Sequence, residues 1–331
     1  MGPLVAWMLL HFVVAAVCTW LARRYALHRK LVDQPGERRS HSVATPRGGG
    51  ISILLAVLLG IGWMLIEWPV YRLLLSCVAT GLALVAGIGW ADDHRPLSSW
   101  LRLAVQGVAG LVLAWGFHST LGEALPAVIA FVLVMVLVNI WNFMDGIDGL
   151  ATSQAALVAG GLALLTGGNG LLGWSAAGLA AACLGFLPFN FPKARIFLGD
   201  VGSGALGYLL AALLTLAYTT TQVPWPLLLL PLAAFLVDAG FTLGMRMLRG
   251  ERWWTPHVTH AYQAWARREA GHIRVSLAYA AFTLVGVILM LTGLSWSWFA
   301  AVWMGLLWYV FTFLLWARLR KDVPMSKETK Q

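Results

Sequence analysis

The chain has 331 residues, of which 60% are hydrophobic and only 11% are charged. Soluble globular domains contain about 45–50% apolar and about 25% charged residues, so soluble, disordered and secreted proteins are excluded. The formal net charge of +9 is compatible with nucleic-acid binding, but in so apolar a chain it is better explained by basic loops on one membrane face. We therefore expect no nucleic-acid partner. The three cysteines lie inside apolar stretches, which argues against a disulfide framework or a cysteine zinc site.

Apolar stretches follow one another along nearly the whole chain, and a membrane-spanning helix needs about 20 such residues. The sequence predicts an all-α integral membrane protein with about 11 spans (10–11), built as a single polytopic domain over 1–331 with a flexible tail at 321–331. The first stretch is expected to be an anchor, because no Lys or Arg precedes it and Arg23 and Arg24 follow it. The predicted spans are 3–22, 48–66, 71–91, 101–118, 124–143, 151–166, 171–188, 204–221, 226–246, 275–292 and 297–317.

The basic residues indicate the orientation of these spans. If segment 23–47 is cytoplasmic and the sides alternate, the cytoplasmic segments hold 22 of the 23 Lys and Arg residues, and only Arg72 falls outside. This is the positive-inside pattern. It predicts a multi-pass protein of the bacterial inner membrane with a periplasmic N-terminus and a cytoplasmic C-terminus. The long polar segments are also on the inside, so the active site is expected at the cytoplasmic face.

Most acidic residues are on that same face. Ionisable groups at the ends of spanning helices are costly and by default suggest function. A single such aspartate is more simply explained as a helix cap. The functional interpretation is preferred here because five of them fall in three motifs on one face: Asp92, Asp93, Asp145, Asp148 and Asp200.

The three motifs favour a metal-assisted reaction on phosphates. Asp92 and Asp93 are adjacent carboxylates, which repel unless a cation or proton lies between them. Asn139, Asn142 and Asp145 recur at three-residue spacing, which would place them on one face of a continuing helix. Asp200 lies among glycines at a helix start, where N–H groups are free to bind phosphate. Oxygen ligands favour Mg²⁺ or Mn²⁺ over Zn²⁺, and Mg²⁺ favours a phosphate-bearing substrate.

These segments resemble the polyprenyl-phosphate N-acetylhexosamine-1-phosphate transferase superfamily (glycosyltransferase family 4). The resemblance runs from Leu31 to about Gln263 and includes Val32-Asp33-Gln34-Pro35, Arg38-Arg39-Ser40-His41 and Thr45-Pro46-Arg47-Gly48-Gly49-Gly50 besides the three aspartate motifs. The loop Pro256-His257-Val258-Thr259-His260-Ala261-Tyr262-Gln263 is similar to the form found in the branch that initiates O-antigen synthesis.

The resemblance implies an Mg²⁺-dependent phosphoglycosyltransferase, with Mn²⁺ as a substitute. It would transfer an N-acetylhexosamine 1-phosphate from a UDP-sugar to undecaprenyl phosphate, release UMP and form the polyprenyl-diphospho-sugar that initiates O-antigen, lipopolysaccharide or another cell-surface glycan. The donor is UDP-GlcNAc or a 6-deoxy relative, UDP-N-acetylfucosamine or UDP-N-acetylquinovosamine. Relatives suggest a homodimer within the membrane lipids. Whether the transfer is a single step, and which of Asp92 and Asp93 acts as base, stay open.

Roles are carried over by position in the motifs. The resemblance makes Asp92, Asp93, Asp145 and Asp200 catalytic, with Asp200 and Asn142 as the metal ligands. Asp148 would read uracil, with Phe197 stacked on it. The remaining expected substrate-binding residues are Arg39, His41, Arg102, Arg195, His257 and His260.

Other interpretations were weighed against this one. A zinc pair of His257 and His260 lacks a third ligand nearby. CDP-alcohol phosphotransferases need Ala-Arg after Asp-Gly-x-x, and Asp145-Gly146 is followed by Ile-Asp-Gly. A secondary transporter would carry charge near the midplane and internal repeats, and only Asp238 is a candidate. For Asp238 a structural ion pair with Arg246, eight residues on, is preferred to catalysis.

Overall fold

The computed structural model describes residues 2–33, 44–251 and 258–320. Each of the eleven predicted apolar stretches forms helix. Ten of them are continuous helices: α1 (Gly2–His28), α2 (Ile51–Glu67), α3 (Arg72–His94), α4 (Ser99–Leu121), α5 (Ala124–Phe143), α6 (Leu150–Leu165), α7 (Gly170–Asn190), α8 (Gly199–Thr220), α12 (Gly271–Thr292) and α13 (Trp298–Arg320).

The ninth stretch is broken near its start. It consists of α9 (Trp225–Leu228), the 3₁₀ turn η2 (Leu230–Leu232) and α10 (Ala233–Leu248). Pro226 and Pro231 begin these short pieces, where their missing N–H groups do little harm. Between α10 and α12 lie the short helix α11 (Ala261–Trp265) and the π-helical turn η3 (Ala266–Ala270). Two further 3₁₀ turns, η1 (Pro69–Tyr71) and η4 (Gly293–Ser295), connect α2 to α3 and α12 to α13.

Length and hydropathy support a multi-pass membrane protein. In the described part of the chain, nine helical segments are long and apolar enough to cross a bilayer, the α9–α10 unit among them. Helices α2 and α6, at 17 and 16 residues, are shorter than the about 20 residues of a full span. Nine of the eleven predicted spans are therefore supported, and the count of eleven and the orientation of the termini stay predictions.

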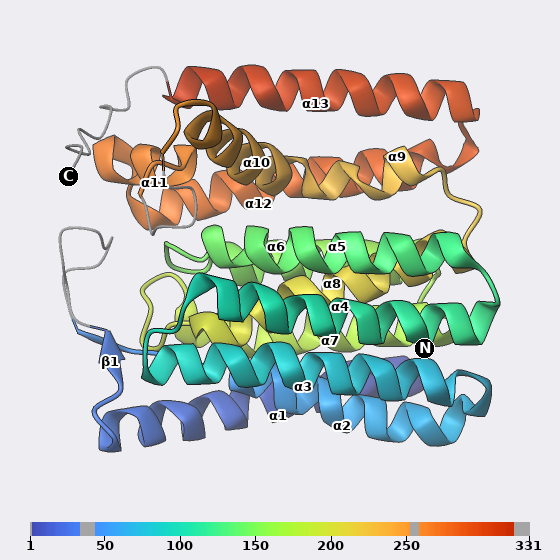
Figure 1. Cartoon of the computed structure of the whole chain (residues 1–331), viewed down its shortest axis with the longest axis horizontal. Coiled ribbons are helices and arrows are strands. Elements are labelled where there is room, and N and C mark those ends of the chain that lie inside the picture. The colour runs from blue at the N-terminus through green and yellow to red at the C-terminus, as the bar shows by residue number, and fades with distance from the viewer. Residues whose placement is uncertain (1, 34–43, 252–257, 321–331) are drawn as a thin grey trace.

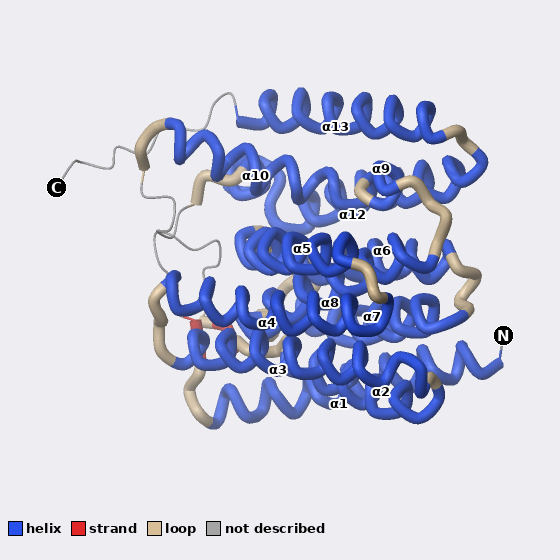
Figure 2. Tube along the Cα trace, turned by 45° about the vertical axis from the view of Figure 1, so that its right-hand side comes forward, coloured by secondary structure: helices blue, strands red, loops and turns tan. Residues whose placement is uncertain are grey.

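The helices run side by side along one direction, with α1 and α2 at one edge and α13 at the other (Figures 1 and 2). Helix α8 is the centre of the bundle, because it packs against α3 and α5 and its residues from Val201 to Ala217 are all buried. Helices α1 and α13 expose most of their apolar side chains, as expected for helices that face lipid. The core therefore surrounds α8, and the start of α8 carries Asp200.

One end of the bundle holds the polar connections. The left-hand end in Figure 1 carries α11 and a short antiparallel ladder of β1 (Val32–Asp33) and β2 (Thr45–Pro46), in which Val32 pairs with Pro46. Each strand has only two residues, so the fold agrees with the all-α prediction. Phe197 N donates to Pro46 O at 2.8 Å, which fixes β2 beside the start of α8. The described ends of the connection between α1 and α2 are thereby held beside the start of α8.

Candidate active site

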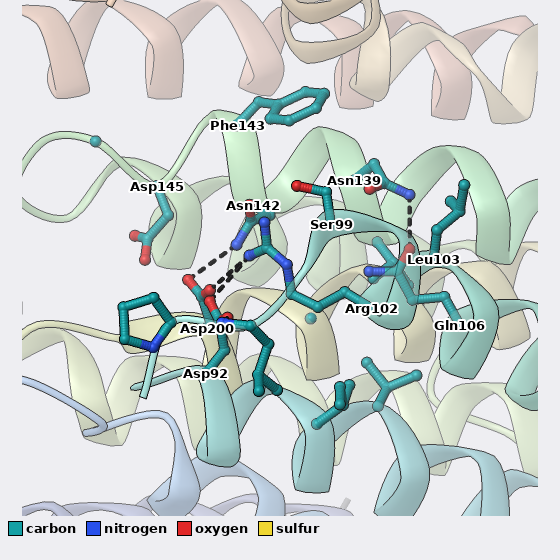
Figure 3. Close-up of a pocket in the computed structure, with 18 of the residues that line it drawn as sticks. Asp92, Ser99, Arg102, Leu103, Gln106, Asn139, Asn142, Phe143, Asp145 and Asp200 are labelled. Atoms are coloured by element: carbon teal, nitrogen blue, oxygen red, sulfur yellow. Dashed lines mark hydrogen bonds and ion pairs between the residues drawn. The ribbon is translucent and has the colours of Figure 1, made fainter. Parts of the chain in front are cut away.

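Four helix ends bring polar side chains together. Asp92 comes from the end of α3, Arg102 from the start of α4, Asn142 from the end of α5 and Asp200 from the first turn of α8 (Figure 3). The Arg102 guanidinium donates to Asp92 Oδ2 at 3.0 Å and to Asp200 Oδ2 at 3.1 Å. Asn142 Nδ2 donates to Asp200 Oδ1 at 3.0 Å. The expected convergence of the aspartate motifs is therefore present in the structure.

The two adjacent aspartates have different surroundings. Asp93 is 5% exposed, and its two carboxylate oxygens accept the backbone N–H groups of Asp200 at 3.2 Å and Val201 at 3.3 Å. Asp93 thus satisfies the start of α8, so these N–H groups are not free for phosphate as the sequence suggested. The close approach needs glycine: Gly199 has φ +76°, and a Cβ there would lie 2.6 Å from Asp93 Oδ2.

Asp145 completes a cluster of carboxylates. It lies in the loop between α5 and α6, and in Figure 3 its carboxylate points toward the Asp200 group. Burial raises the pKa of Asp145 well above its ordinary value, and the nearby charges of Asp200, Asp93 and Asp148 raise it further. Like charges this close require a proton or a bound cation between them. The clustered carboxylates therefore favour a metal ion or another cationic group at this site.

Two cavities meet at this cluster. The larger has a volume of about 570 Å³, and the smaller about 270 Å³. Both are lined by Arg47, Asp145, Gly146, Asp200 and Gln263, so these residues form a shared edge. The larger cavity has one polar end, with Asp92, Arg102 and Asn142, and its remaining wall is largely apolar, with Val85, Ile88, Leu97, Leu103 and Val138.

The smaller cavity combines an aromatic ring with a fixed carboxylate. Phe197 and Asp148 both line it. Asp148 Oδ2 accepts the N–H of Ala194 at 3.2 Å and lies 3.3 Å from Nδ1 of His272, on α12. Ser276 Oγ also donates to the Asp148 carbonyl at 2.7 Å. The carboxylate is held from two sides, which gives it the fixed direction that specific hydrogen bonding requires.

The other predicted site residues differ in whether they line the cavities. His260 is buried and lines the larger cavity, where its ring stacks on Phe143 at 6.0 Å between ring centroids. Arg195 is exposed and lines neither cavity, because its guanidinium donates to the Pro188 carbonyl at 2.5 Å and lies over Phe189. Arg39, His41 and His257 lie outside the described residues.

The sequence interpretation did not single out two residues of the cavities. His272 gave no signal, because a lone histidine at a helix start is common. Gln106 did give one, since it is a polar residue inside the predicted span 101–118. It lines the larger cavity, where its Oε1 accepts a hydrogen bond from Asn139 Nδ2 at 2.8 Å (Figure 3).

The donor set fits magnesium. Among the described residues no three His, Cys, Asp or Glu side chains gather closely enough to hold a metal by themselves. Mg²⁺ does not need such a cage, because it commonly takes one or two carboxylates together with water and substrate phosphates. Asp200 supplies such a carboxylate, and reversing the amide of Asn142 would turn its oxygen toward the same point.

Comparisons with known proteins agree with this geometry. The model of glycosyl transferase family 4 matches residues 75–218, which include Asp92, Asn142, Asp145 and Asp200. A phospho-N-acetylmuramoyl-pentapeptide-transferase of Synechococcus sp. (strain JA-3-3Ab) is 31% identical over 81% of this chain and 84% of its own length. The chain belongs to glycosyl transferase family 4.

Two further relatives of this family carry other donor names. A decaprenyl-phosphate N-acetylglucosaminephosphotransferase of Mycobacterium tuberculosis (strain CDC 1551 / Oshkosh) is 32% identical over 62% of this chain, and the alignment spans 59% of that relative. A probable undecaprenyl-phosphate N-acetylglucosaminyl 1-phosphate transferase of Bacillus subtilis (strain 168) is 26% identical over 93% of this chain and 88% of its own length. The family membership is thus clear, while the relatives differ in the sugar that their names state.

Proposed function

We propose that this protein transfers an N-acetylhexosamine 1-phosphate from a UDP-sugar to undecaprenyl phosphate and releases UMP. The observation that carries the proposal is the pair of cavities that share an edge at Asp145 and Asp200. One cavity has apolar walls and a cationic end, and the other has an aromatic ring and a fixed carboxylate. These are the features required to bring a lipid phosphate and a nucleotide diphosphate to one point.

The larger cavity suits the lipid acceptor. Its apolar wall, formed by α3, α4 and α5, matches a polyprenyl chain, and Arg102 lies at its polar end. A guanidinium recognises phosphate through charge-assisted hydrogen bonds. In the structure Arg102 is shared by Asp92 and Asp200, so an arriving phosphate would compete for it. Arg47, whose guanidinium donates to the Asp93 carbonyl, lies at the shared edge and can meet either phosphate.

The smaller cavity suits the donor nucleotide. Phe197 offers a face on which a pyrimidine can stack, and Asp148 offers an acceptor for the uracil N–H. With the base beside Asp148, the diphosphate would extend toward Asp145 and Asp200 at the shared edge. The donor sugar would then lie near Gln263 and His260, which both line the larger cavity.

The metal site proposed is Asp200 with Asn142, together with the donor diphosphate. Bound there, Mg²⁺ would neutralise charge on the diphosphate and make UMP a better leaving group. Mn²⁺, which has similar ligand preferences, would substitute. Asp145, whose pKa is raised by burial and by neighbouring carboxylates, would regain its charged form beside such a cation.

The reaction balances without a redox partner. An oxygen of the lipid phosphate forms a bond to the phosphorus that carries the sugar, and the bond from that phosphorus to the bridging oxygen of UMP breaks. A phosphate monoester is already mostly ionised at pH 7. Asp92 therefore serves to orient the acceptor and to take its remaining proton. Asp93 is assigned to holding the start of α8, because both its oxygens already accept backbone N–H groups.

The names of two relatives support one choice of donor. Two of the relatives named above are N-acetylglucosamine phosphotransferases, which favours UDP-GlcNAc over a 6-deoxy relative. The positive-inside pattern of the basic segments supports a reaction at the cytoplasmic face of the bacterial inner membrane. The product would begin a surface glycan such as O-antigen. A homodimer remains a prediction from the resemblance.

The test is UMP release by the protein purified in detergent. It is given undecaprenyl phosphate and Mg²⁺, and UDP-GlcNAc is compared with UDP-GalNAc and the two 6-deoxy donors. Release that needs both lipid and Mg²⁺ is expected with one donor preferred, and Asp200→Asn should abolish it. A folded wild-type protein that releases no UMP from any donor would exclude the proposed transferase and reopen the transporter interpretation.

A further inference from the structure

Asp238 on α10 is a buried carboxylate that the proposed reaction does not use. It is 1% exposed, and it does not pair with Arg246 as the sequence suggested, because Arg246 forms an ion pair with Glu251 at 3.0 Å. Asp238 instead accepts the backbone N–H groups of Ala261 at 2.8 Å and Tyr262 at 3.0 Å.

Three side chains reach the same carboxylate. Tyr279 on α12 donates its hydroxyl to Asp238 Oδ2 at 2.8 Å, and Nδ1 of His260 lies 3.7 Å from Oδ1. Thr242, one turn along α10, donates to Oδ1 at 3.4 Å. A buried charge is tolerated only when such donors surround it, so their number indicates that this carboxylate is ionised and fixed. Asp238 therefore joins α10, α11 and α12 at one point.

The two backbone donors mark the start of α11. They are the first N–H groups of α11, which have no partner inside the helix. Asp238 satisfies them from a different helix, as an N-cap side chain does from its own, and its negative charge suits the positive end of the helix. Helix α11 has five residues and continues directly into η3 and α12, so its start is the end that needs a cap. Asp238 caps this start together with the capping box of His260 and Gln263.

Helix α11 in turn forms a wall of the site. Tyr262 and Gln263 line the larger cavity, and the Tyr262 hydroxyl donates to the Phe143 carbonyl at 2.9 Å. Burial and the nearby carboxylates raise the pKa of Tyr262 well above its ordinary value, so its hydroxyl keeps the proton that it donates. A Cβ at Gly146 would overlap that hydroxyl, which shows how closely the ring supports the loop that carries Asp145.

We propose that Asp238 is a positioning residue for the transfer reaction: by anchoring α11 it holds Tyr262 against the loop of Asp145. This inference rests on the proposed function. Removing the charge should release α11 and misplace Asp145 relative to Asp200. Supporting residues of this kind typically change activity by about 10–100-fold. Asp148 is held by Ala194 and His272, and Phe197 N donates to Pro46, all of which lie outside α11. UMP affinity should therefore change far less than kcat.

The experiment compares three variants of the full chain in detergent. Asp238→Asn removes the charge without changing shape, and Tyr279→Phe removes one of its donors. Thr283→Val is the matched control: Thr283 lies one turn from Tyr279 on α12, is also buried, and donates to Gln154 rather than toward α11. The measurements are kcat and KM for UMP release, the Kd for UMP, and hydrogen exchange of the α11 amides.

Asp238→Asn should lower kcat by about 10–100-fold, keep the Kd for UMP within about threefold, and speed exchange in α11. Tyr279→Phe should show a smaller loss in kcat, and Thr283→Val none. An active wild type whose Asp238→Asn variant keeps its kcat would overturn the inference. An inactive wild type would overturn the proposed function instead, and unchanged α11 exchange in Asp238→Asn would then overturn the anchoring role independently.

Discussion

Asp200 and Asp238 are both aspartates in apolar helices near the same end of the bundle, yet their surroundings are opposite. Asp238 is enclosed by backbone N–H groups and a tyrosine hydroxyl of its own protein. Asp200 shares Arg102 with Asp92, and in the described part of the chain this arginine is the only cation that contacts it. Asp93 and Asp145 add further negative charge nearby.

The difference distinguishes a carboxylate with a structural role from one that we propose binds a metal ion. A carboxylate with all its acceptor positions occupied has no affinity left for a cation. A carboxylate that competes with a neighbouring acid for a single arginine gains from a metal ion, because the metal relieves repulsion as well as forming bonds. The reaction should therefore depend on Asp200 through Mg²⁺, whereas Asp238 should act only through α11.

The strongest test of this comparison is the variant Asp200→Asn. It preserves shape but removes the charge that would bind Mg²⁺, so kcat should fall by at least about 10²–10³-fold. The folded state should persist, because the buried N–H groups at the start of α8 are held by Asp93. UMP release at saturating substrates measures the effect, with Glu123→Gln at the exposed opposite end as the control. A variant that keeps normal turnover would show that Asp200 does not bind the essential metal.

Arg102 tests the cationic half of the same site. Arg102→Gln removes the guanidinium that bridges Asp92 and Asp200 and that we assign to the lipid phosphate. The KM for undecaprenyl phosphate should rise by about 10–100-fold, which corresponds to the loss of one or two charge-assisted hydrogen bonds. Arg72→Gln, an exposed arginine elsewhere in the chain, is the matched control. An increase confined to the KM for the UDP-sugar would assign Arg102 to the donor instead.

The donor cavity is probed by Phe197→Leu. The change removes the aromatic face and keeps an apolar side chain, so the KM for the UDP-sugar should rise by about fivefold to tenfold while the KM for the lipid is unchanged. Base stacking of this kind contributes about 1–3 kcal/mol. Phe189→Leu is the control, because Phe189 lies beneath Arg195 and lines neither cavity. Equal effects of the two variants would remove Phe197 from the binding site.

The sequence was sufficient to predict the helices and the face on which the acids gather. Long apolar stretches leave few alternatives to spanning helices, and Asp92, Asn142 and Asp200 all stand at helix ends that the charge pattern assigns to one side. The small β ladder was not predicted, because it depends on how connections pack over the bundle. The short helix α6 (Leu150–Leu165) nearly matches the predicted stretch 151–166, so the length of this helix was readable from the sequence.

The sequence did not predict how the aspartates divide their roles within the site. Asp92 and Asp93 are neighbours on one helix, about 100° apart, and only the position of α8 decides which of them meets backbone and which meets the larger cavity. Asp238 has a plausible partner on its own helix, Arg246, but its backbone donors come from α11 and its tyrosine donor from α12. Such long-range contacts are set by tertiary packing, which a motif or a spacing does not record.

The smallest expected effect concerns stability, and it again distinguishes a crowded carboxylate from a satisfied one. The folded pKa of Asp145 is raised, so folding favours its protonated form. Stability should therefore fall as pH rises from the ordinary carboxyl range through the raised value, relative to a variant that cannot ionise. Without divalent cations, Asp145→Asn should unfold about 2–4 °C above wild type near pH 8, with a smaller gap near pH 5. Added Mg²⁺ should narrow that gap by stabilising the wild type. Glu123→Gln should show no such pH dependence of stability. If the wild type is at least as stable as Asp145→Asn at every pH, the ionised Asp145 carboxylate does not destabilise the folded protein.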